Sequence, residues 1–441
     1  MQKILVLGAG MVAGPLIRYL LDHNYGLTVT SLGLEDAVKL VGGDPHGTAL
    51  SLDLSDDATL SQLVGEHDLV ISLVPYSFHP LVANHCLQKG KNLITASYVS
   101  AEMAAFDQEA KEQGLIFLNE IGLDPGIDHM SAMRIIDDVH ARGGKIRHFR
   151  SYCGGLPAPD ANDNPYGYKF SWAPRGVLMA SRNGARYWRD NHEVNVRPER
   201  LFRDMHLLDV PGAGVFEAYP NRDSLEYRDI YELGDEVRSV FRGTLRYIGW
   251  CNTMHSLVKI GMLDTEPRNS KDMTYADYMR DLLDAEPAED LRVVAASRMR
   301  LPPDTLPPWN MHWLGLFSRR PIGRDQISPL DALSEIMQDK LRYNPGERDM
   351  VVLFHEFKAW FAEDDHYECL TSSLVDYGVR YGDSSMSRTV SLPAAIAARL
   401  ILEGKITSRG VLRPVIPEIY NPVLDELANL NIVCAEEKTV Y

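Results

Sequence analysis

Cysteine is scarce in this chain of 441 residues and shows no paired spacing. The five cysteines are odd in number, scattered, and form no C-x-x-C motif: Cys86, Cys153, Cys251, Cys369 and Cys434. This pattern argues against a disulfide framework and against a zinc site, so no metal ligands are expected. Reduced thiols are typical of a reducing compartment.

Long apolar runs are also missing. No stretch has the length that spanning a bilayer requires, and the start, MQKILVLGAG, enters a strand at once instead of showing a signal-peptide layout. There is no internal repeat and no low-complexity tract. The sequence therefore predicts a cytoplasmic protein that does not bind membranes.

Basic residues are in deficit. Lys and Arg total 45 against 61 Asp and Glu, a net charge of −16. Such a chain gains nothing from non-specific binding to nucleic acid or to an anionic membrane. An anionic small-molecule substrate would require cations concentrated in one place. The apolar fraction of 45% is typical of a globular protein, and the length predicts two or three domains.

Residues 1–125 alternate short apolar strands with helical stretches. The predicted strands are Ile4–Leu7, Leu27–Ser31, Ala49–Leu52, Asp68–Leu73, Asn92–Ala96 and Ile116–Asn119. The predicted helices are Met11–His23, one after Ser55, His79–Lys89 and Ala101–Gln113. This alternation predicts an α/β fold with a doubly wound parallel sheet, the Rossmann arrangement.

The pattern changes at the turn-rich segment 122–126, where we expect the chain to cross into another domain. Residues 126–262 and 346–390 are predicted to form a mixed-sheet α+β domain that binds substrate, and 263–345 a helical subdomain. The expected strands of the mixed-sheet domain include Arg147–Tyr152, His206–Leu208, Phe216–Tyr219, Asp349–Phe357 and Cys369–Tyr377. A helix is predicted over Ser391–Leu402, entered at Pro393. The C-terminal segment, about 391–441, is a candidate for packing back on the first domain.

A glycine-rich loop follows the first strand. It runs Gly8-Ala9-Gly10-Met11-Val12-Ala13 and opens a helix. Gly8 suits a tight turn and Gly10 lets the backbone approach a pyrophosphate, which then lies at the positive end of the helix. The alternative is a plain strand–helix turn. The position of the loop in a βαβ run favours a dinucleotide cofactor.

The second strand ends without the acidic residue that usually binds the ribose of NAD, and without an Arg for the phosphate of NADP. Ser31 and its neighbour Thr30 are compatible with either group, and NADP is slightly favoured because no carboxylate repels its phosphate. Asp53 and Leu54 are placed to border the adenine, although Asp53 could equally cap a helix. Ser72, Leu73 and Val74 lie near the switch point of the sheet, beside the nicotinamide half.

Longer strings resemble saccharopine dehydrogenase of the glutamate-forming type, and the likeness covers nearly the whole chain. The strings span residues 95–100, 119–129, 151–157, 164–172, 219–224 and 242–247. The resemblance implies a Rossmann domain, a mixed-sheet domain that also forms a homodimer, and a helical subdomain. It implies a reversible NAD- or NADP-dependent step of lysine metabolism in which saccharopine is cleaved to L-glutamate and 2-aminoadipate 6-semialdehyde. It also implies that the matched Ser97, Tyr98, Asp124 and Cys153 lie around substrate and cofactor.

A substrate with three carboxylates requires fixed cations, and Arg binds carboxylates through two prongs. Inside the matched strings Arg222 is the first candidate, ahead of Arg246; Arg242 and Lys169 are weaker. Thr244 lies in the same string as Arg246. Phe170 and Trp172 are candidates to line the aliphatic chain of the substrate, or else belong to the core.

Proton transfer needs a base near the secondary amine. Asp124, in the turn-rich crossing, is predicted to act as that base or to anchor an ammonium group, while its alternative role is an Asx turn before Pro125. Tyr98 could donate a hydrogen bond or relay a proton. Asp128 is expected to cap a helix, and His129 is a weaker base candidate. Cys153 is expected beside the reaction without being a nucleophile; its alternative is core packing.

Two other functions compete with this prediction. A polyamine dehydrogenase of the same superfamily, of the carboxynorspermidine dehydrogenase or homospermidine synthase type, would act on cations and would need acidic residues where this chain has Arg222 and Arg246. A non-catalytic sensor of nicotinamide redox state would not need Asp124, Cys153 and Arg222 together.

Overall fold

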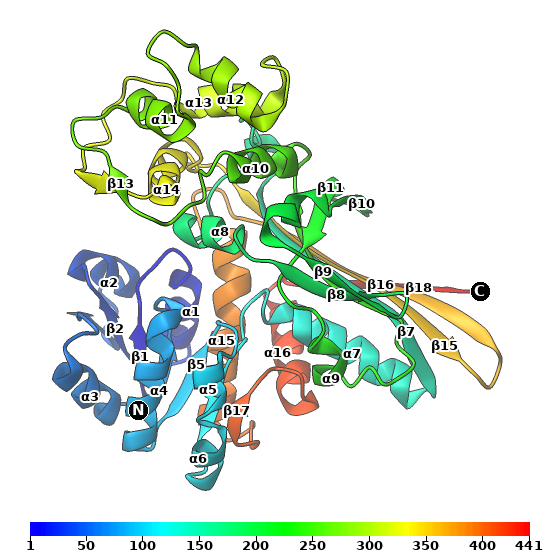
Figure 1. Cartoon of the computed structure of the whole chain (residues 1–441). Helices are drawn as coiled ribbons and strands as arrows, with labels where there is room; N and C mark the ends of the chain where they lie inside the picture. Colours follow the sequence, from blue (N-terminus) through cyan, green and yellow to red (C-terminus); the bar gives the residue numbers. More distant parts are fainter. The chain divides into compact units, whose positions relative to one another are not determined.

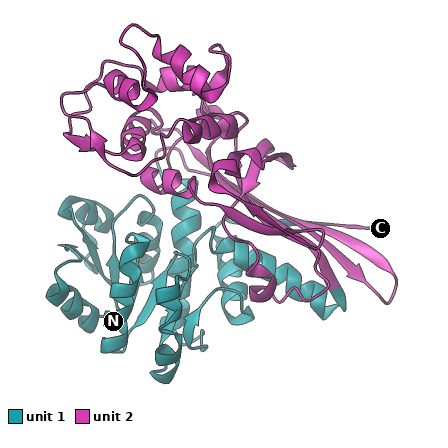
Figure 2. Ribbon diagram, in the orientation of Figure 1, with its two compact units in different colours: residues 1–144, 382–436 teal, residues 145–381, 437–441 magenta.

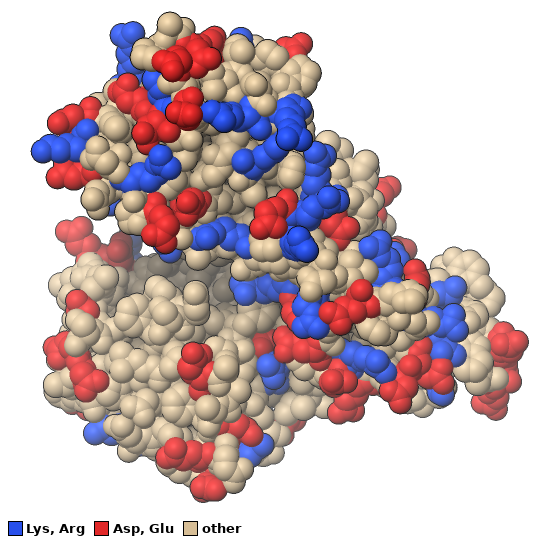
Figure 3. All heavy atoms as spheres, viewed as in Figure 1, with Lys and Arg blue, Asp and Glu red and all other residues tan.

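The computed structural model describes residues 1–441, which form two compact units (Figure 2). Unit 1 comprises Met1–Gly144 and Gly382–Glu436, and unit 2 comprises Lys145–Tyr381 and Glu437–Tyr441. On the face drawn in Figure 3, acidic and basic side chains are interspersed, so the net charge of −16 is not gathered into one acidic patch there. None of the helices combines the length and the apolar character that crossing a bilayer requires.

Unit 1 is built on a parallel sheet of seven strands (Figure 1). In spatial order these are β17 (Gly410–Leu412), β6 (Ile116–Leu118), β5 (Asn92–Thr95), β4 (Leu69–Ser72), β1 (Lys3–Leu7), β2 (Gly26–Ser31) and β3 (Gly47–Ser51). The central strands β1 and β4 are fully buried along their apolar residues, as expected for a sheet covered on both faces. All six predicted strands are present, and the Rossmann prediction is confirmed; β17, contributed by the C-terminal segment, was not predicted.

The helices of unit 1 include two that the sequence did not reveal. They are α1 (Gly14–Asp22), α2 (Leu34–Val41), α3 (Asp57–Glu66), α4 (His79–Lys89), α5 (Ala101–Ala104), α6 (Asp107–Glu112), α7 (Ile127–Ala141), α15 (Ser385–Leu402) and α16 (Pro417–Asn429). Helices α2 and α16 were not predicted. Helix α1 starts at Gly14 and not at Met11, because residues 11 and 12 form a turn and Met11 is 60% exposed.

The compact unit extends beyond the boundary expected at residue 125, because helix α7 belongs to unit 1. Two contacts tie it to α16 of the same unit: Arg134 forms an ion pair with Asp425 at 2.7 Å, and the Tyr420 hydroxyl donates to Asp137. The compact unit therefore extends to Gly144.

The start predicted for the helix over 391–402 was wrong. Helix α15 begins six residues earlier, where the Ser384 side chain caps it by accepting a hydrogen bond from the Ser387 backbone N–H. Hydroxyl-rich sequence usually favours turns, but here the hydroxyls of Thr389 and Ser391 donate to carbonyls four residues back, at 2.8 and 2.7 Å. Their polar groups are thus satisfied inside a buried helix, and Pro393 lies in its interior.

Unit 2 is built on a mixed sheet of nine strands. Its main path is β10 (His206–Val210), β11 (Gly214–Pro220), β12 (Ser239–Arg246), β7 (Gly144–Pro157), β15 (Asp349–Phe361), β16 (His366–Tyr377) and β18 (Ala435–Val440), with β8 (Ala185–Arg189) and β9 (His192–Val196) beside it. Strands β7 and β12 are parallel and the other described pairs of this sheet are antiparallel. The mixed sheet was predicted, but its interior strand β12 and the strands β8, β9 and β18 were not.

The helical segment shares the core of this sheet. Its elements are α10 (Trp250–Lys259), β13 (Arg268–Asn269), α11 (Tyr275–Leu283), α12 (Leu291–Met299), α13 (Leu306–Leu314), β14 (Gln326–Ile327) and α14 (Pro329–Lys340); α8 (Pro174–Ala180) and α9 (Tyr227–Ile230) precede them. One hydrophobic cluster includes Tyr152 and Leu245 of the sheet together with Met279 and Ile336 of the helices. Residues 263–345 are therefore helical, as predicted, but do not form a separate compact unit.

Candidate active site

In unit 1, the carboxyl ends of β1 and β4 lie side by side where the strand order of the sheet reverses, the position at which doubly wound sheets bind ligands. Gly8, which follows β1, lies against the backbone at the end of β2 and just after β4. Its φ is +108°, its N–H donates to the Thr30 carbonyl at 2.9 Å, and a Cβ on it would lie 3.0 Å from the Leu73 carbonyl oxygen. Only glycine suits this position, because both the backbone conformation and the space exclude a side chain.

The rest of the glycine loop presents bare backbone. A Cβ built on Gly10 would meet no heavy atom within 4 Å, and the Ala13 N–H donates to the Gly10 carbonyl at 3.1 Å. The loop, which includes Ala9, Met11 and Val12, is therefore held in shape while leaving open space above Gly10. This arrangement fits a dinucleotide pyrophosphate.

The residues predicted near the adenosine lie at the ends of β2 and β3. Ser31 is half-buried at the end of β2, whereas the Thr30 hydroxyl is buried and donates to the Val6 carbonyl at 3.4 Å. Asp53, just after β3 and beside half-buried Leu54, accepts the Ser55 N–H at 2.9 Å, which lowers the pKa of Asp53. The capping role considered for Asp53 was wrong.

Helix α3 is capped by another residue. Asp56 accepts the Thr59 backbone N–H at 3.1 Å and its hydroxyl at 2.6 Å. The Asp53 carboxylate therefore belongs to the loop after β3 and not to the helix start.

A buried histidine connects the ends of β4 and β5. His79 is 2% exposed; its Nδ1 lies 2.9 Å from the Ser72 Oγ, and its Nε2 lies 2.8 Å from the Ser97 Oγ and 3.0 Å from the Thr95 Oγ1. Burial lowers the pKa of His79 to about 4, so the imidazole is neutral at neutral pH. Sequence reasoning placed His79 only as the first residue of a helix, and no spacing signal links it to Ser97.

Tyr98 and Asp124 come together although they are 26 residues apart. The Tyr98 hydroxyl donates to the Asp124 Oδ1 at 2.8 Å. Asp124 lies in a tight turn closed by Gly126, where a Cβ would be 1.9 Å from the Gly122 carbonyl oxygen. Two of the three predicted catalytic residues thus share one hydrogen bond within unit 1.

A buried charge cluster supports the backbone that carries Tyr98. Glu120 is 1% exposed; its Oε1 accepts the Val99 N–H at 3.0 Å and the Arg413 Nε–H at 2.8 Å, and its Oε2 lies 2.8 Å from the His129 Nε2. Burial alone disfavours the carboxylate, but the bond and charge of His129 and the charge of Arg413 outweigh it and lower the pKa of Glu120 to about 2. An acidic residue two positions after a buried strand is a sequence signal for this cluster, but Glu120 was not among the predicted site residues.

This cluster changes the interpretation of two neighbouring residues. His129 is fully buried and bonded to Glu120, so the structure places it in the support of the turn and not as a base. Asp128 accepts the Gly126 N–H at 2.6 Å, which ties the start of α7 to the turn.

In unit 2, three strands place predicted residues in one row. The register pairs Thr244 of β12 with Cys153 of β7 on one side and with Tyr219 of β11 on the other. Directly paired residues point to the same face of a sheet, and Arg246, two residues after Thr244, shares that face. Cys153 is 7% exposed.

Arg246 is a buried cation without an acidic partner. It is 5% exposed, its Nη1 donates to the Leu245 carbonyl at 2.7 Å, and its Nε has no hydrogen-bond partner. Its guanidinium lies over the rings of Tyr168 and Trp250, at 4.9 and 5.5 Å from their centroids. No carboxylate lies within 4.0 Å of it.

The neighbours of Arg246 do not supply a negative charge. Glu217, opposite Arg246 in the register, instead accepts the backbone N–H groups of Gly249 and Cys251 at 2.9 and 2.7 Å. Burial raises the pKa of Tyr219 to about 12, and burial also raises the pKa of Tyr168, so both phenols are neutral at pH 7. An isolated charge buried in this way is costly unless an anion joins it.

The other predicted cations differ from Arg246. Lys169 is buried between Asp163 and Glu347, with Nζ–oxygen distances of 2.9 and 2.7 Å, so it has a structural role. Arg242 is buried and lies 4.4 Å from the Tyr227 ring centroid.

Arg222 is exposed and has a left-handed backbone with φ of +58°. Its carbonyl accepts the Arg186 N–H at 3.0 Å, and the N–H of Ser224 donates to the Arg186 carbonyl at 2.7 Å. The Arg222 loop is therefore tied down by its backbone, as Pro220 led us to expect.

The two aromatic candidates occupy different environments. Phe170 is 5% exposed and belongs to the hydrophobic core, edge-on to the Tyr168 ring at 5.3 Å. Trp172 is half-buried and packs against Gly176, where an added Cβ would lie 2.6 Å from the indole.

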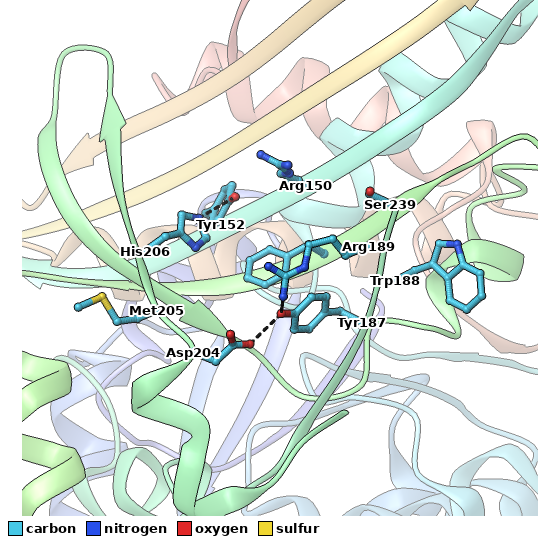
Figure 4. Close-up of a pocket in the computed structure, with 10 residues that line it drawn as sticks. Arg150, Tyr152, Tyr187, Trp188, Arg189, Asp204, Met205, His206 and Ser239 are labelled. Carbon is cyan, nitrogen blue, oxygen red and sulfur yellow. Dashed lines mark hydrogen bonds between the residues drawn. The ribbon is translucent and has the colours of Figure 1, made fainter. Parts of the chain in front are cut away.

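A separate cavity of about 230 Å³ lies on the other face of the sheet of unit 2 (Figure 4). Tyr152 lines it, whereas Cys153, the next residue of the strand, points to the opposite face. Some of its polar groups bond to one another: Arg189 donates to the Tyr187 hydroxyl, which donates to Asp204 at 2.8 Å (Figure 4). It contains no unpaired cation comparable to Arg246.

Comparison with known proteins assigns both parts of the chain to one family. The model of the saccharopine dehydrogenase NADP binding domain matches residues 4–118, and that of the saccharopine dehydrogenase C-terminal domain matches residues 122–432. The chain is 40% identical to saccharopine dehydrogenase [NADP(+), L-glutamate-forming] of Pyricularia oryzae, over 100% of this chain and 99% of the relative. It is 36% identical to the alpha-aminoadipic semialdehyde synthase of Arabidopsis thaliana over 98% of this chain and 44% of that protein.

A solved structure agrees with the fold. Apo histidine-tagged saccharopine dehydrogenase (L-Glu forming) from Saccharomyces cerevisiae superposes with a TM-score of 0.88 at 39% identity, covering 100% of both chains. The identity, the coverage and the fold lead to the same assignment: this chain belongs to the saccharopine dehydrogenase family.

Proposed function

We propose that this chain oxidises saccharopine with NADP as cofactor and releases L-glutamate and 2-aminoadipate 6-semialdehyde, in a reversible step of lysine metabolism. The carbon that bears the secondary amine loses a hydride, and the nitrogen loses a proton, which leaves a C=N bond. Water adds to that bond and the C–N bond breaks, so the balance is one saccharopine, one water and one oxidised nicotinamide converted to two products, one reduced nicotinamide and one proton.

The observation that carries this proposal is the unpaired Arg246. A buried guanidinium that lacks any carboxylate within 4.0 Å is suited to a carboxylate of the ligand, because the ligand then supplies the missing charge. Thr244 in the same row and Arg222 on its rigid loop add a hydroxyl and a second guanidinium for the remaining carboxylates. A cationic polyamine would meet a positive charge at Arg246, which disfavours the polyamine alternatives.

In unit 1 we assign proton transfer to the pair of Tyr98 and Asp124. Asp124 takes the proton of the secondary amine, and the hydrogen bond from Tyr98 at 2.8 Å keeps its carboxylate oriented. Ser97 contacts the substrate from the same loop. Cys153 lies beside the reacting atoms and forms no covalent bond, because the C=N bond forms between substrate atoms. Trp172 borders the aliphatic chain, and Phe170 supports that wall from the core.

The cofactor is assigned to unit 1. Gly8, Ala9, Gly10, Met11 and Val12 would hold the pyrophosphate. Ser31, Asp53 and Leu54 would surround the adenosine, and Ser72, Leu73 and Val74 the nicotinamide half. Bound NADP supplies the acceptor for the hydride. The lack of an acidic side chain at Ser31 suits the extra phosphate of NADP.

Absorbance at the reduced-nicotinamide band tests the function directly. Saccharopine with NADP should produce reduced cofactor and one equivalent of glutamate, and NAD should be the poorer substrate. Gly10→Val serves as the control: it should abolish NADP binding in calorimetric titration while leaving thermal unfolding unchanged, because its side chain enters open space. If wild-type protein binds NADP but saccharopine yields no reduced cofactor, the proposal is wrong.

We also propose a homodimer, as the family resemblance implies. Sedimentation equilibrium should give twice the mass of 49.5 kDa. A monomer at all concentrations would contradict this assignment and would leave the proposed reaction unaffected.

A further inference from the structure

The imidazole of His79 connects two groups of residues that the proposed function keeps apart. One is the end of β4 at the cofactor loop, represented by Ser72, and the other is the substrate loop after β5, represented by Ser97. Ser72 is 1% exposed and Thr95 is 1% exposed, whereas Ser97 is half-buried. His79 therefore contacts the Ser97 hydroxyl from the buried side, and the partial exposure of Ser97 leaves that hydroxyl within reach of a ligand.

The hydrogen-bond count makes this contact directional. A neutral imidazole has one N–H donor and one acceptor nitrogen, so Nδ1 and Nε2 cannot both donate. The Thr95 hydroxyl is bound on both sides, because its Oγ1 also accepts the Ser97 backbone N–H at 3.2 Å. When Nε2 carries the proton, it can donate to the Ser97 hydroxyl, which then keeps its own proton for a ligand; when Nε2 is the acceptor, the Thr95 and Ser97 hydroxyls compete to donate to it.

We infer that His79 is a positioning residue that orients the Ser97 hydroxyl toward saccharopine and links it to the nicotinamide loop through Ser72. This inference rests on the proposed function. His79 touches neither substrate nor cofactor; it acts through the two serines. Loss of its Nε2 contact affects the use of saccharopine, and loss of its Nδ1 contact affects the binding of NADP.

Two substitutions separate the two contacts. The amide of Asn reaches about as far as Nδ1 of His, and the amide of Gln about as far as Nε2. His79→Asn therefore retains the Ser72 contact and loses Ser97, and His79→Gln does the reverse. His79→Asn should lower kcat/KM for saccharopine by about 10- to 100-fold with an almost unchanged Kd for NADP. His79→Gln should restore most of kcat/KM for saccharopine and weaken NADP binding.

A second buried histidine provides the matched control. His67 is 4% exposed in the same unit, with Nδ1 2.6 Å from the Leu63 carbonyl oxygen and Nε2 2.7 Å from the Thr28 Oγ1. It precedes the amino end of β4, whereas His79 follows the carboxyl end of that strand. His67→Asn and His67→Gln should change stability alone, so they measure the general cost of replacing a buried imidazole.

Two outcomes would overturn the inference. In the first, the Asn and Gln variants of His79 lower kcat/KM for saccharopine equally. In the second, neither His79 variant lowers kcat/KM for saccharopine by more than the His67 variants do. If the His79 variants fail to fold, imidazole ¹⁵N shifts of wild-type protein decide: they should change on Ser97→Ala, and unchanged shifts would exclude the link. Should wild-type protein not oxidise saccharopine at all, the proposed function fails, and the NADP affinities of the two His79 variants still test the Ser72 half.

Discussion

Each unit buries charged side chains, and the two units differ in whether those charges are balanced. In unit 1 the Glu120 carboxylate is matched by Arg413, by His129 and by the Val99 N–H. In unit 2 the Arg246 guanidinium lies over aromatic rings with no carboxylate near it. A balanced cluster holds the backbone in one conformation, whereas an unbalanced one is stable only at a cost that a ligand can remove.

Lys169 shows that unit 2 does pair buried cations where their role is structural. Its ammonium contacts two carboxylates, at 2.9 and 2.7 Å. The isolation of Arg246 is therefore a property of that position and not of the unit. The comparison leads to opposite expectations for the two clusters: changes at Glu120 should affect folding, and changes at Arg246 should affect substrate use.

Removing the charge of Glu120 should have the largest effect on stability. Glu120→Gln leaves His129 and Arg413 without their anion and should lower the free energy of unfolding by about 3 kcal/mol, the low end of the range for a buried pair because Arg413 reaches solvent. Urea unfolding measures it. The control is Glu403→Gln, a more exposed carboxylate of the same unit paired with Arg399, which should cost at most about 1 kcal/mol. Equal losses in the two variants would refute the balanced-cluster interpretation.

The stability difference between wild type and Glu120→Gln should depend on pH. The pKa of Glu120 is lowered from 4.5 to about 2 in the folded protein, so its ionised form stabilises the fold above pH 4.5, and this contribution is lost as the pH falls from 4.5 toward about 2. The gap in thermal unfolding temperature between wild type and Glu120→Gln should be constant above about pH 5 and shrink in acid. A gap that widens on acidification would reverse the sign and contradict the assignment.

Replacing Arg246 should affect the use of saccharopine and not stability, the opposite of what we expect for Glu120. Arg246→Met keeps the packing volume and removes the charge, so kcat/KM for saccharopine should fall by about 100-fold or more while thermal stability stays the same or rises. Arg246→Lys should recover only part of the activity, because an ammonium cannot hold a carboxylate with two prongs. Lys169→Met is the paired control and should destabilise the protein. Full activity in Arg246→Met would remove the central support for the proposed function.

The exposed Arg222 should have a smaller effect. Arg222→Ala should raise KM for saccharopine by about 10-fold and leave the affinity for NADP unchanged. Because the backbone at this position is left-handed, Arg222→Gly separates the side chain from backbone strain. Equal losses in the Ala and Gly variants assign the effect to the guanidinium; a loss in Ala alone would assign it to the loop conformation.

Cys153 should show the smallest effect. Cys153→Ser should lower kcat by less than about 10-fold, because the reaction needs no covalent bond to sulfur. Cys369→Ser, a half-buried cysteine elsewhere in unit 2, should not change kcat. Complete inactivity of a well-folded Cys153→Ser protein, or a trapped covalent adduct, would contradict this role.

Several of these residues were found from the sequence because their signals are local. Gly8 and Gly10 follow an apolar strand closely, and each of the six strands of residues 1–125 coincides with a short apolar run in the sequence. Tyr98 and Asp124 were found through strings that resemble a known family. Their hydrogen bond was not predicted, because the spacing of 26 residues carries no geometric information.

Other features could not be read from the chain. The serines and threonine at the start of α15 look like a loop, since nothing in their order reveals that their hydroxyls bond to carbonyls of their own helix. Arg222 was ranked above Arg246 because its Pro-containing loop is visible in the sequence. Whether a cation has an acidic neighbour depends on residues far away along the chain, so that ranking could not include the isolation of Arg246.

The sequence by itself determined the class of protein: a Rossmann unit with a glycine loop, a second α+β part, an acidic chain with arginines placed in a few motifs, and the family to which those motifs belong. These properties follow from periodicity, composition and contiguous strings. Only the tertiary structure decided which charges are balanced, because Arg413 reaches Glu120 across 293 residues and Glu217 accepts backbone N–H groups at the start of α10 instead of pairing with Arg246. Electrostatic pairing depends on distance in space, and the order of residues along the chain does not contain that distance.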